Sequence, residues 1–419
     1  MALGVGMVAT EMRFTFAGGK TRTTEWRFLN LSFILQIARV ISSCKLDLKE
    51  LHRWMKPEKV KTTMSTYPSS AEIDLELSYF HQKSPLPRHL CFRNSWGNTW
   101  INGYLSVKVV EGGVPETTAL LDQKWDKIFY TGNTKVGRII LAAAAKHLTP
   151  VVLELGGKCP LVVDSNTNLK VTARRIIVGK WGSNSGQTCV SPDYVISTKA
   201  FASKLVDAIS SELEKFYGKD PLQSNDMPSI INSRHFERLT NLLEDDKVSG
   251  KIVIGGQWDK ANLKIAPTVV LDVSEDSLIM KEEIFGPLLP IVTVNEIEDS
   301  IRVINAKEKA LAAYLFTNDK KLKEEFIRSV SAGGMSINET TLHLAERTLP
   351  FGGVGESGMG SYHGKFSFDA FSHKKSVLIR GFSGDIAARY PPYTHEKLNF
   401  LKAMLSGNIF RILRALIGW

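Results

Sequence analysis

Cysteine is scarce in this chain, and long uncharged apolar runs are missing. The four cysteines are Cys44, Cys91, Cys159 and Cys189, and no two of them form a CxxC pair. This spacing excludes a paired-cysteine zinc site and a disulfide framework, and it predicts a reducing compartment. No apolar run reaches the ~18 residues that a spanning helix needs. Because no basic segment precedes the short apolar N-terminus, we predict a cytoplasmic protein without a signal peptide.

Internal repeats and low-complexity segments are also missing, which excludes a fibrous protein and a disordered tail protein. Apolar residues make up 43% and charged residues 23% of the sequence, which is ordinary for a chain that buries a core. A length of 419 residues suits two or three domains.

Acidic residues are outnumbered, with 43 Asp and Glu against 53 Lys and Arg, for a net charge of +10. Residues 361–419 hold nine basic and three acidic residues, so they carry +6 of that charge. Such a cluster suits nucleic acid or an anionic membrane. Because no basic-aromatic stripe accompanies it, we predict no nucleic-acid partner. Residues 397–419 place apolar residues at helical spacing, typical either of a segment in a membrane interface or of a helix packed on protein.

From about residue 107 the apolar pattern alternates between short strands and helices, which predicts a parallel α/β sheet. Residues 74–106 show neither period and are predicted to be irregular. The predicted strands are residues 107–110, 127–130, 151–155, 252–254, 268–271 and 290–294. The predicted helices are residues 136–146, 169–180, 202–217, 297–306 and 320–330.

Glu154 stands at the end of a predicted strand and is followed by Gly156 and Gly157. A carboxylate held at a strand end can act as a general base if burial raises its pKa toward neutrality. Alternatively, the motif is a strand-ending turn with a surface glutamate.

Cys189 ends the motif Gly186-Gln187-Thr188-Cys189 on a predicted loop. A thiol among small and polar residues can be a nucleophile whose own backbone N–H helps to bind an oxyanion. The alternative is an inert buried cysteine.

Gly132, Asn133 and Gly137 lie between a predicted strand and the helix that follows it. Glycines there let a dinucleotide pyrophosphate approach the helix N-terminus, although this is not the usual GxGxxG spacing. A true GxGxxG match occurs at residues 353–358. Because it follows no clear strand and opens no long helix, we interpret it as a flexible loop rather than a dinucleotide site.

Glu283 and Phe285 lie in the motif Glu282-Glu283-Ile284-Phe285-Gly286-Pro287. The acidic pair and the phenylalanine either bind a ribose and a ring of a ligand or simply precede a turn closed by Gly-Pro.

Taken in this order, these motifs resemble the aldehyde dehydrogenase superfamily, and within it family 3 of plant type, related to fatty aldehyde dehydrogenase. The resemblance runs from Val107 to Trp419, with shorter matches at residues 22–27 and 42–73. It is also carried by Lys124-Trp125-Asp126-Lys127, Phe129-Tyr130-Thr131-Gly132, Ala145-Lys146-His147-Leu148-Thr149-Pro150 and Pro350-Phe351-Gly352-Gly353.

The resemblance implies oxidation of aldehydes, medium-chain, long-chain or lipid-derived, to carboxylic acids with NAD or NADP. Cys189 would form a thiohemiacetal and then a thioester, which water activated by Glu154 would hydrolyse. Glu283 would hydrogen-bond the nicotinamide ribose, with Phe285 packed nearby. Gly132 and Gly137, with Asn133 between them, would flank the cofactor pyrophosphate. No metal is implied.

Two elements of the family are missing between Ile73 and Val107. One is a strand ending in Trp-Asn-Tyr-Pro, whose Asn donates an oxyanion hydrogen bond, and the other is Lys-Pro-Ser-Glu, which holds the adenosine ribose. The abrupt edges predict a truncated or alternatively spliced member. The alternative function is therefore a catalytically impaired variant that acts only as a dimer partner or has no function.

The resemblance also implies the domain organisation. It predicts two Rossmann-like parallel-sheet domains and a C-terminal oligomerisation segment, in a chain that forms a homodimer. Residues 1–157 would hold N-terminal helices and an incomplete cofactor-binding domain, and residues 158–360 the catalytic domain. Residues 361–419 would form the oligomerisation segment and a basic amphipathic tail, which related fatty aldehyde dehydrogenases use for peripheral membrane association.

Overall fold

The computed structural model describes residues 112–383 and 385–417, together with four short strands and six further positions between residues 47 and 105. The predicted strand at residues 107–110 lies outside the described residues, as do Cys44 and Cys91. The chain divides into two compact units. One unit comprises Met1–Ser43 and Phe80–Ala370, and the other comprises Cys44–Tyr79 and Phe371–Trp419.

The larger sheet of the first unit has seven strands within the described residues, in the order β15-β14-β7-β8-β13-β12-β9. Every neighbouring pair is parallel except β12 and β9. The strands are β7 (Pro160–Val163), β8 (Tyr194–Thr198), β9 (Ile252–Ile254), β12 (Thr268–Leu271), β13 (Leu288–Val294), β14 (Ala312–Phe316) and β15 (Gly334–Ile337). The predicted parallel α/β fold is confirmed.

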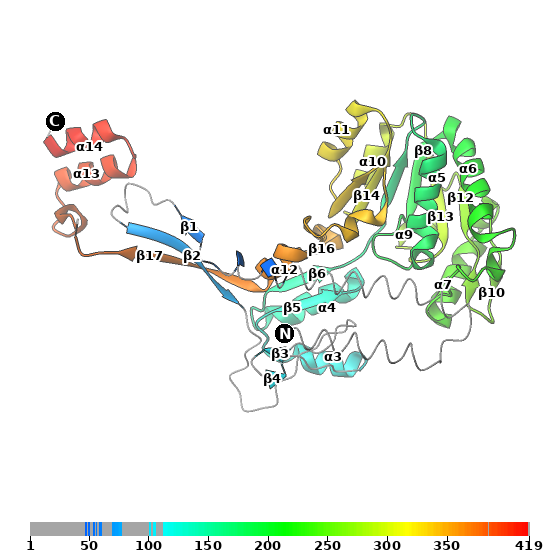
Figure 1. Cartoon of the computed structure of the whole chain (residues 1–419), viewed down its shortest axis with the longest axis horizontal. Coiled ribbons are helices and arrows are strands. Elements are labelled where there is room, and N and C mark those ends of the chain that lie inside the picture. The colour runs from blue at the N-terminus through cyan, green and yellow to red at the C-terminus, as the bar shows by residue number, and fades with distance from the viewer. Residues whose placement is uncertain are drawn as a thin grey trace. The chain divides into compact units, whose positions relative to one another are not determined.

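Helices cover both faces of this sheet, so its inner strands are apolar at consecutive positions. In β7, Leu161 and Val163 belong to the core that contains residues of α5 and α6, whereas Val162 belongs to the core that contains residues of α7, α10 and α11 (Figure 1). The helices are α5 (Leu169–Ile177), α6 (Lys199–Tyr217), α7 (Ser233–Glu244), α10 (Asp299–Asn305) and α11 (Lys320–Ser329). The predicted helix over residues 169–180 ends earlier, because the chain changes to a π-helical turn at Val178–Gly182.

A smaller sheet pairs β5 (Ile128–Thr131) with β6 (Val151–Glu154) in parallel, and β16 (Gly358–Met359) with the other side of β6. Between β5 and β6 lies α4 (Thr134–Ala145), whose Ile140 packs on Leu153 and Leu155. Helix α3 (Val114–Leu121) precedes this sheet. Since β6 leads directly into β7, the segment from Glu154 to Cys159 connects the two sheets.

The second unit contains a three-stranded antiparallel sheet in the order β1-β2-β17. Its strands are β1 (Glu58–Val60), β2 (Ser69–Leu77) and β17 (Ser372–Arg380), and α13 (His395–Leu405) and α14 (Ile409–Ile417) follow them. The prediction that residues 74–106 are irregular is therefore wrong for residues 74–77, which pair with β17. Ile73, Leu75 and Leu77 alternate with acidic residues, a strand pattern that continues across the edge of the family resemblance.

Two shorter strands lie in the same predicted irregular stretch. They are β3 (Trp100–Ile101) and β4 (Tyr104–Leu105), which pair with each other in antiparallel orientation. The other residues between 78 and 106 lie outside the described part of the chain.

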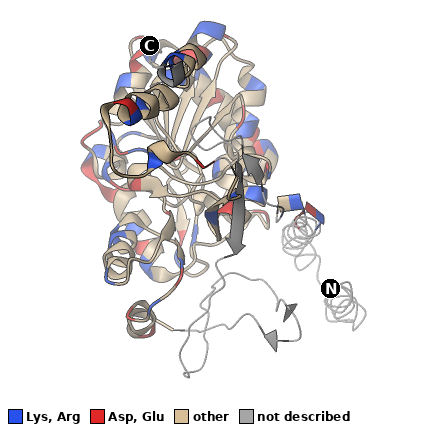
Figure 2. Cartoon of the chain, turned by 90° about the vertical axis from the view of Figure 1, so that its left-hand side faces the viewer, with Lys and Arg blue, Asp and Glu red and all other residues tan. Residues whose placement is uncertain are grey.

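Basic and acidic residues are interspersed along the described helices in the view of Figure 2. None of the helices in the described part of the chain is long and apolar enough to cross a membrane. In α14 the exposed apolar residues Ile409, Phe410 and Leu413 share the helix with Arg411 and Arg414.

Candidate active site

Cys189 follows an unusually tight turn. Asn184, Ser185 and Gly186 all have left-handed backbone, with φ of 56°, 51° and 76°. A Cβ atom on Gly186 would lie 2.2 Å from the carbonyl oxygen of Gly286, so only glycine allows the two loops this close. Two consecutive non-glycine residues in this region store backbone strain, which is common at functional sites.

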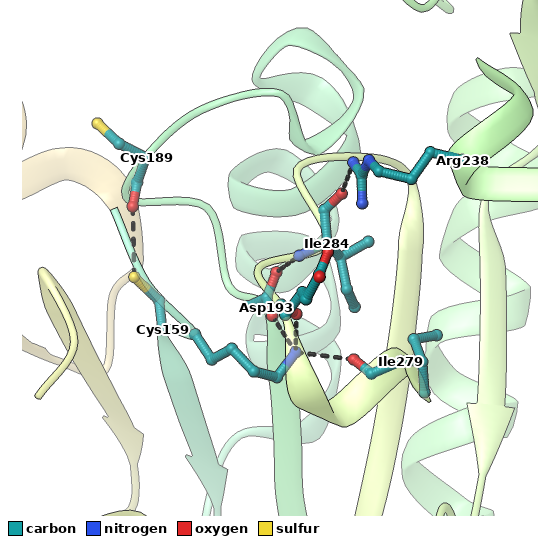
Figure 3. Close-up of polar contacts among 8 residues, drawn as sticks. Cys159, Cys189, Asp193, Arg238, Ile279 and Ile284 are labelled. Carbon is teal, nitrogen blue, oxygen red and sulfur yellow. Dashed lines mark hydrogen bonds and ion pairs between the residues drawn. The ribbon is translucent and has the colours of Figure 1, made fainter. Parts of the chain in front are cut away.

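The Cys189 loop is held by buried side chains. Gln187 donates to the carbonyl of Ser229 (3.2 Å) and accepts from the N–H of Ile231 (2.9 Å). The thiol of Cys159 donates to the carbonyl oxygen of Cys189 (3.4 Å; Figure 3). The nucleophile predicted from the sequence therefore sits on a fixed backbone.

Glu154 ends β6 and is only 6% exposed. Its carboxylate accepts three hydrogen bonds, from the thiol of Cys189 (3.1 Å), the hydroxyl of Thr131 (3.1 Å) and the hydroxyl of Tyr362 (2.8 Å). These donors satisfy a buried charge that would otherwise be costly. The structure thus brings together Glu154 and Cys189, and the surface-turn alternative for Glu154 is wrong.

The thiol of Cys189 is protonated in this arrangement. Burial, followed by the nearby charge of Glu154, raises the pKa of the thiol far above its usual range. Because a thiolate and not a thiol is the effective nucleophile, the proton must leave as Cys189 attacks. The Oε1 atom of Glu154 is the acceptor already in hydrogen-bond contact with Sγ.

Tyr362 was not identified by sequence reasoning. It lies 208 residues after Glu154 and reaches the site through a bridge with Phe351, in which each residue's N–H donates to the other's carbonyl. Its ring packs edge-on against Phe129 and Phe351, with centroids 5.0 Å and 5.4 Å apart. Burial and the charge of Glu154 raise the pKa of Tyr362, so its hydroxyl remains a donor.

Replacing Tyr362 with phenylalanine should lower kcat by about tenfold with little change in KM. The ring packing stays, but the carboxylate loses one of its three donors, a charged hydrogen bond worth ~1.5–3 kcal/mol. Steady-state kinetics and a thermal melt check this expectation. A variant with unchanged kcat would show that the phenol does not act through Glu154.

The GxGxxG match at residues 353–358 is not a dinucleotide loop, as predicted, but neither is it a flexible loop. It forms a 3-10 turn at Gly355–Ser357 and then strand β16, where Gly358 pairs with Glu154. The N–H of Leu155 donates to the carbonyl of Ser357 (3.0 Å), and a Cβ on Gly353 would lie 2.0 Å from that same oxygen. The glycines permit close backbone packing against β6, which fixes Glu154.

Glu283 lies beside the glycines that follow Glu154. A Cβ on Gly156 would be 2.4 Å from its carboxylate, and the backbone of Gly157 acts to lower the pKa of that carboxylate. Burial, followed by the charge of Asp193, raises the pKa of Glu283 to about 7. Phe285 has left-handed backbone with φ of 47°, and the following Gly286 contacts the Cys189 loop.

The N-terminus of α4 is capped by Asn133, whose Oδ1 accepts from the N–H of Val136 (2.9 Å). Gly132 lies at the end of β5, and its N–H donates to the carbonyl of Glu154 (3.1 Å). Gly137 is buried, and a Cβ there would lie 2.7 Å from a methyl group of Leu155. At Gly137, α4 packs closely on the strand end. The third glycine of a dinucleotide motif permits the same close packing of a helix on a strand.

No group of three or more His, Cys, Asp or Glu side chains is arranged to hold a metal ion in the described part of the chain. The site combines a partly buried thiol that donates to a buried carboxylate at the end of a parallel strand. A thiol within hydrogen-bond reach of a base is the arrangement that nucleophilic catalysis requires.

Comparison with known proteins identifies the family. The model of the "Aldehyde dehydrogenase family" matches residues 106–377. "Aldehyde dehydrogenase family 3 member H1" of Arabidopsis thaliana is 53% identical over 98% of this chain and 97% of its own length. "Aldehyde dehydrogenase, dimeric NADP-preferring" of Mus musculus is 51% identical over 68% of this chain and 62% of its own. The chain belongs to the aldehyde dehydrogenase family.

A solved structure supports the same assignment. The structure titled "Substrate bound state of Staphylococcus Aureus AldH" superposes with a TM-score of 0.80 at 36% identity, over 88% of this chain and 86% of that one. The alignment with the Arabidopsis relative spans 468 positions, 49 more than the 419 residues of this chain. The relative therefore carries residues that have no counterpart in this chain.

Proposed function

We propose that this chain oxidises aldehydes to carboxylic acids with NAD or NADP, through a covalent intermediate on Cys189. The observation that carries the proposal is the partly buried thiol of Cys189 in hydrogen-bond contact with the buried carboxylate of Glu154 (3.1 Å). The family supports this reaction class. Medium-chain, long-chain or lipid-derived aldehydes are the proposed substrates, from the resemblance to fatty aldehyde dehydrogenase.

In the first step, Sγ of Cys189 attacks the aldehyde carbon. The thiol proton passes to Glu154, a carbon–sulfur bond forms, and the carbonyl π electrons move to oxygen to give a thiohemiacetal. The backbone N–H of Cys189 donates to that oxygen. Three side-chain donors around Glu154 hold the base in place before the substrate arrives.

The residues near this site fit a dinucleotide. The end of β5 leads through Gly132 into the Asn133-capped N-terminus of α4, and Gly137 allows α4 to pack closely on the strand end. The carboxylate of Glu283 lies against Gly156 and Gly157, where any side chain at position 156 would displace it. The bound cofactor would supply the acceptor for the hydride that leaves the substrate carbon. Glu283 would hold its ribose, and Phe285 would pack nearby.

Before the last step, Glu154 releases to solvent the proton that it took from the thiol. Its carboxylate then takes a proton from the water that attacks the thioester carbon on Cys189. The carbon–sulfur bond breaks, the carboxylic acid leaves, and the thiolate takes up the proton held by Glu154. Tyr362 and Thr131 keep the carboxylate oriented in both steps, because they donate to Oε2 while Oε1 faces Cys189.

The affinity for the cofactor should rise between pH 6 and pH 8. The pKa of Glu283 is raised to about 7, so the carboxylate that accepts hydrogen bonds from ribose hydroxyls predominates only above this pH. NADH and NADPH titrations, followed by their fluorescence at several pH values, measure the dependence. The Glu283→Gln variant should lose it, and a pH dependence that survives in this variant would assign the titration to another group.

The reaction itself is tested by the appearance of reduced cofactor with a medium-chain aldehyde and either NAD or NADP. Turnover is the expected result. The sequence shows no match to the family's oxyanion asparagine, and the loss of one such donor costs ~10²–10³ in rate. A folded chain that forms no acyl-enzyme and no reduced cofactor would favour the alternative, an impaired variant that serves only as a dimer partner.

We further propose a cytoplasmic homodimer that contacts intracellular membranes peripherally through α14. The exposed Ile409, Phe410 and Leu413 beside Arg411 and Arg414 support the membrane contact. Vesicle co-sedimentation that persists after deletion of residues 409–419 would contradict it. We also propose domain boundaries at residues 157 and 360. The pairing of β2 with β17 brings together two segments that are distant in the sequence.

A further inference from the structure

The loop that carries Glu283 is fastened by a buried lysine. The ammonium group of Lys158 forms an ion pair with Asp193 and donates to the carbonyl oxygens of Ile279 and Glu282, each at 2.9 Å. The side chains of Lys158 and Asp193 are 10% and 4% exposed. All three ammonium protons therefore have acceptors, and one of these acceptors is the backbone of the residue directly before Glu283.

Both backbone polar groups of Ile284, the residue directly after Glu283, form hydrogen bonds with side chains. The N–H of Ile284 donates to Oδ1 of Asp193 (2.9 Å), and the carbonyl of Ile284 accepts from the guanidinium of Arg238 (2.5 Å; Figure 3). Lys158 comes from the connection between β6 and β7, Asp193 from the residue before β8, and Arg238 from α7. Three side chains from separate parts of the sequence thus converge on three consecutive peptide groups. Lys158 and Asp193 hold the two that flank Glu283, and Arg238 holds the next one, between Ile284 and Phe285.

None of these bonds reaches Cys189 or Glu154. They hold backbone atoms of Glu282 and Ile284, the residues directly before and after Glu283, so they act on the position of the Glu283 carboxylate. That position is tightly defined, because the carboxylate already excludes any side chain at Gly156. A displacement of Glu283 by one ångström is enough to break a hydrogen bond to a ligand hydroxyl.

We infer that Arg238, Lys158 and Asp193 are positioning residues that set the affinity for the cofactor by fixing the Glu283 carboxylate, without acting on the sulfur chemistry of Cys189. The inference rests on the proposed function, since it deepens the role of Glu283 in that site. A purely structural role for the three residues would lower stability and affect every activity of the chain together.

Arg238→Met is the first test, because Arg238 is only partly buried and its loss leaves no unpaired buried charge. Loss of a hydrogen bond from a charged donor should raise the Kd for NADH or NADPH by about tenfold. Hydrolysis of 4-nitrophenyl acetate without cofactor should stay unchanged, since it needs Cys189 but not Glu283. Arg175→Met is the matched control, because Arg175 also donates to a backbone carbonyl, that of Asn338. It should leave Kd unchanged.

A double-mutant cycle shows whether Arg238 acts through Glu283. In a Glu283→Ala background, Arg238→Met should change Kd no further, because the carboxylate that it positions is gone. An equal, additive rise in both backgrounds would overturn the inference, as would a wild-type Kd in Arg238→Met. A wild-type chain that binds neither NADH nor NADPH would instead overturn the proposed function.

Discussion

Replacing Cys189 with alanine is expected to abolish aldehyde oxidation, with a loss of at least ~10⁴ in kcat. Among the described groups in contact with Glu154, only the thiol of Cys189 can form a covalent bond to an aldehyde and hold the oxidised product as a thioester. The substitution removes a partly buried thiol and one hydrogen bond to Glu154, so the fold should persist. Reduced-cofactor formation and a thermal melt, measured side by side, check both parts.

The control for this loss is the other described cysteine. Cys159 is fully buried and donates only to the carbonyl of Cys189, and burial raises the pKa of its thiol far above the usual range. Cys159→Ala should therefore retain most of the activity at some cost in stability. If Cys189→Ala turns over aldehyde while Cys159→Ala does not, the nucleophile has been assigned to the wrong sulfur.

The sheet of the first unit could be predicted only in part. The predicted strands at residues 252–254, 268–271 and 290–294 coincide with β9, β12 and β13, whereas β7, β8, β14 and β15 have no predicted counterpart. In β7 the buried run of Leu161, Val162 and Val163 is short and does not alternate, because the strand is covered on both faces. The pairing of β2 with β17 could not be predicted from local sequence patterns. It joins Ser69–Leu77 to Ser372–Arg380, and no local pattern specifies a partner three hundred or so residues away.

The pairing of Glu154 with Cys189 could be predicted from the family resemblance, because the motifs are specific when they occur together in this order, although each motif alone allows an inert alternative. The residues that hold this pair could not. Tyr362 meets Glu154 only because Phe351 and Tyr362 pair across a loop, and Arg238 meets Ile284 only in the folded structure. The GxGxxG match is the opposite case. Its sequence indicates only a loop, but in the structure its glycines permit close backbone packing against β6.

Glu154→Gln should lower steady-state turnover by about 10²–10⁴, the usual contribution of general base catalysis. A neutral amide cannot take a proton from water, so the thioester should persist and its mass should be detectable on the intact protein. Glutamine keeps the shape of the side chain and its oxygen can accept from Tyr362, which limits the structural change.

The rate of the first turnover in the same variant tests a second role of Glu154. The Cys189 thiol has a strongly raised pKa and donates directly to this carboxylate, so its activation should slow together with deacylation. Rapid-mixing experiments should therefore show a burst of reduced cofactor that is slower than in the wild type and is followed by almost no turnover. A burst at the wild-type rate would mean that another base removes the thiol proton and that Glu154 acts only on water.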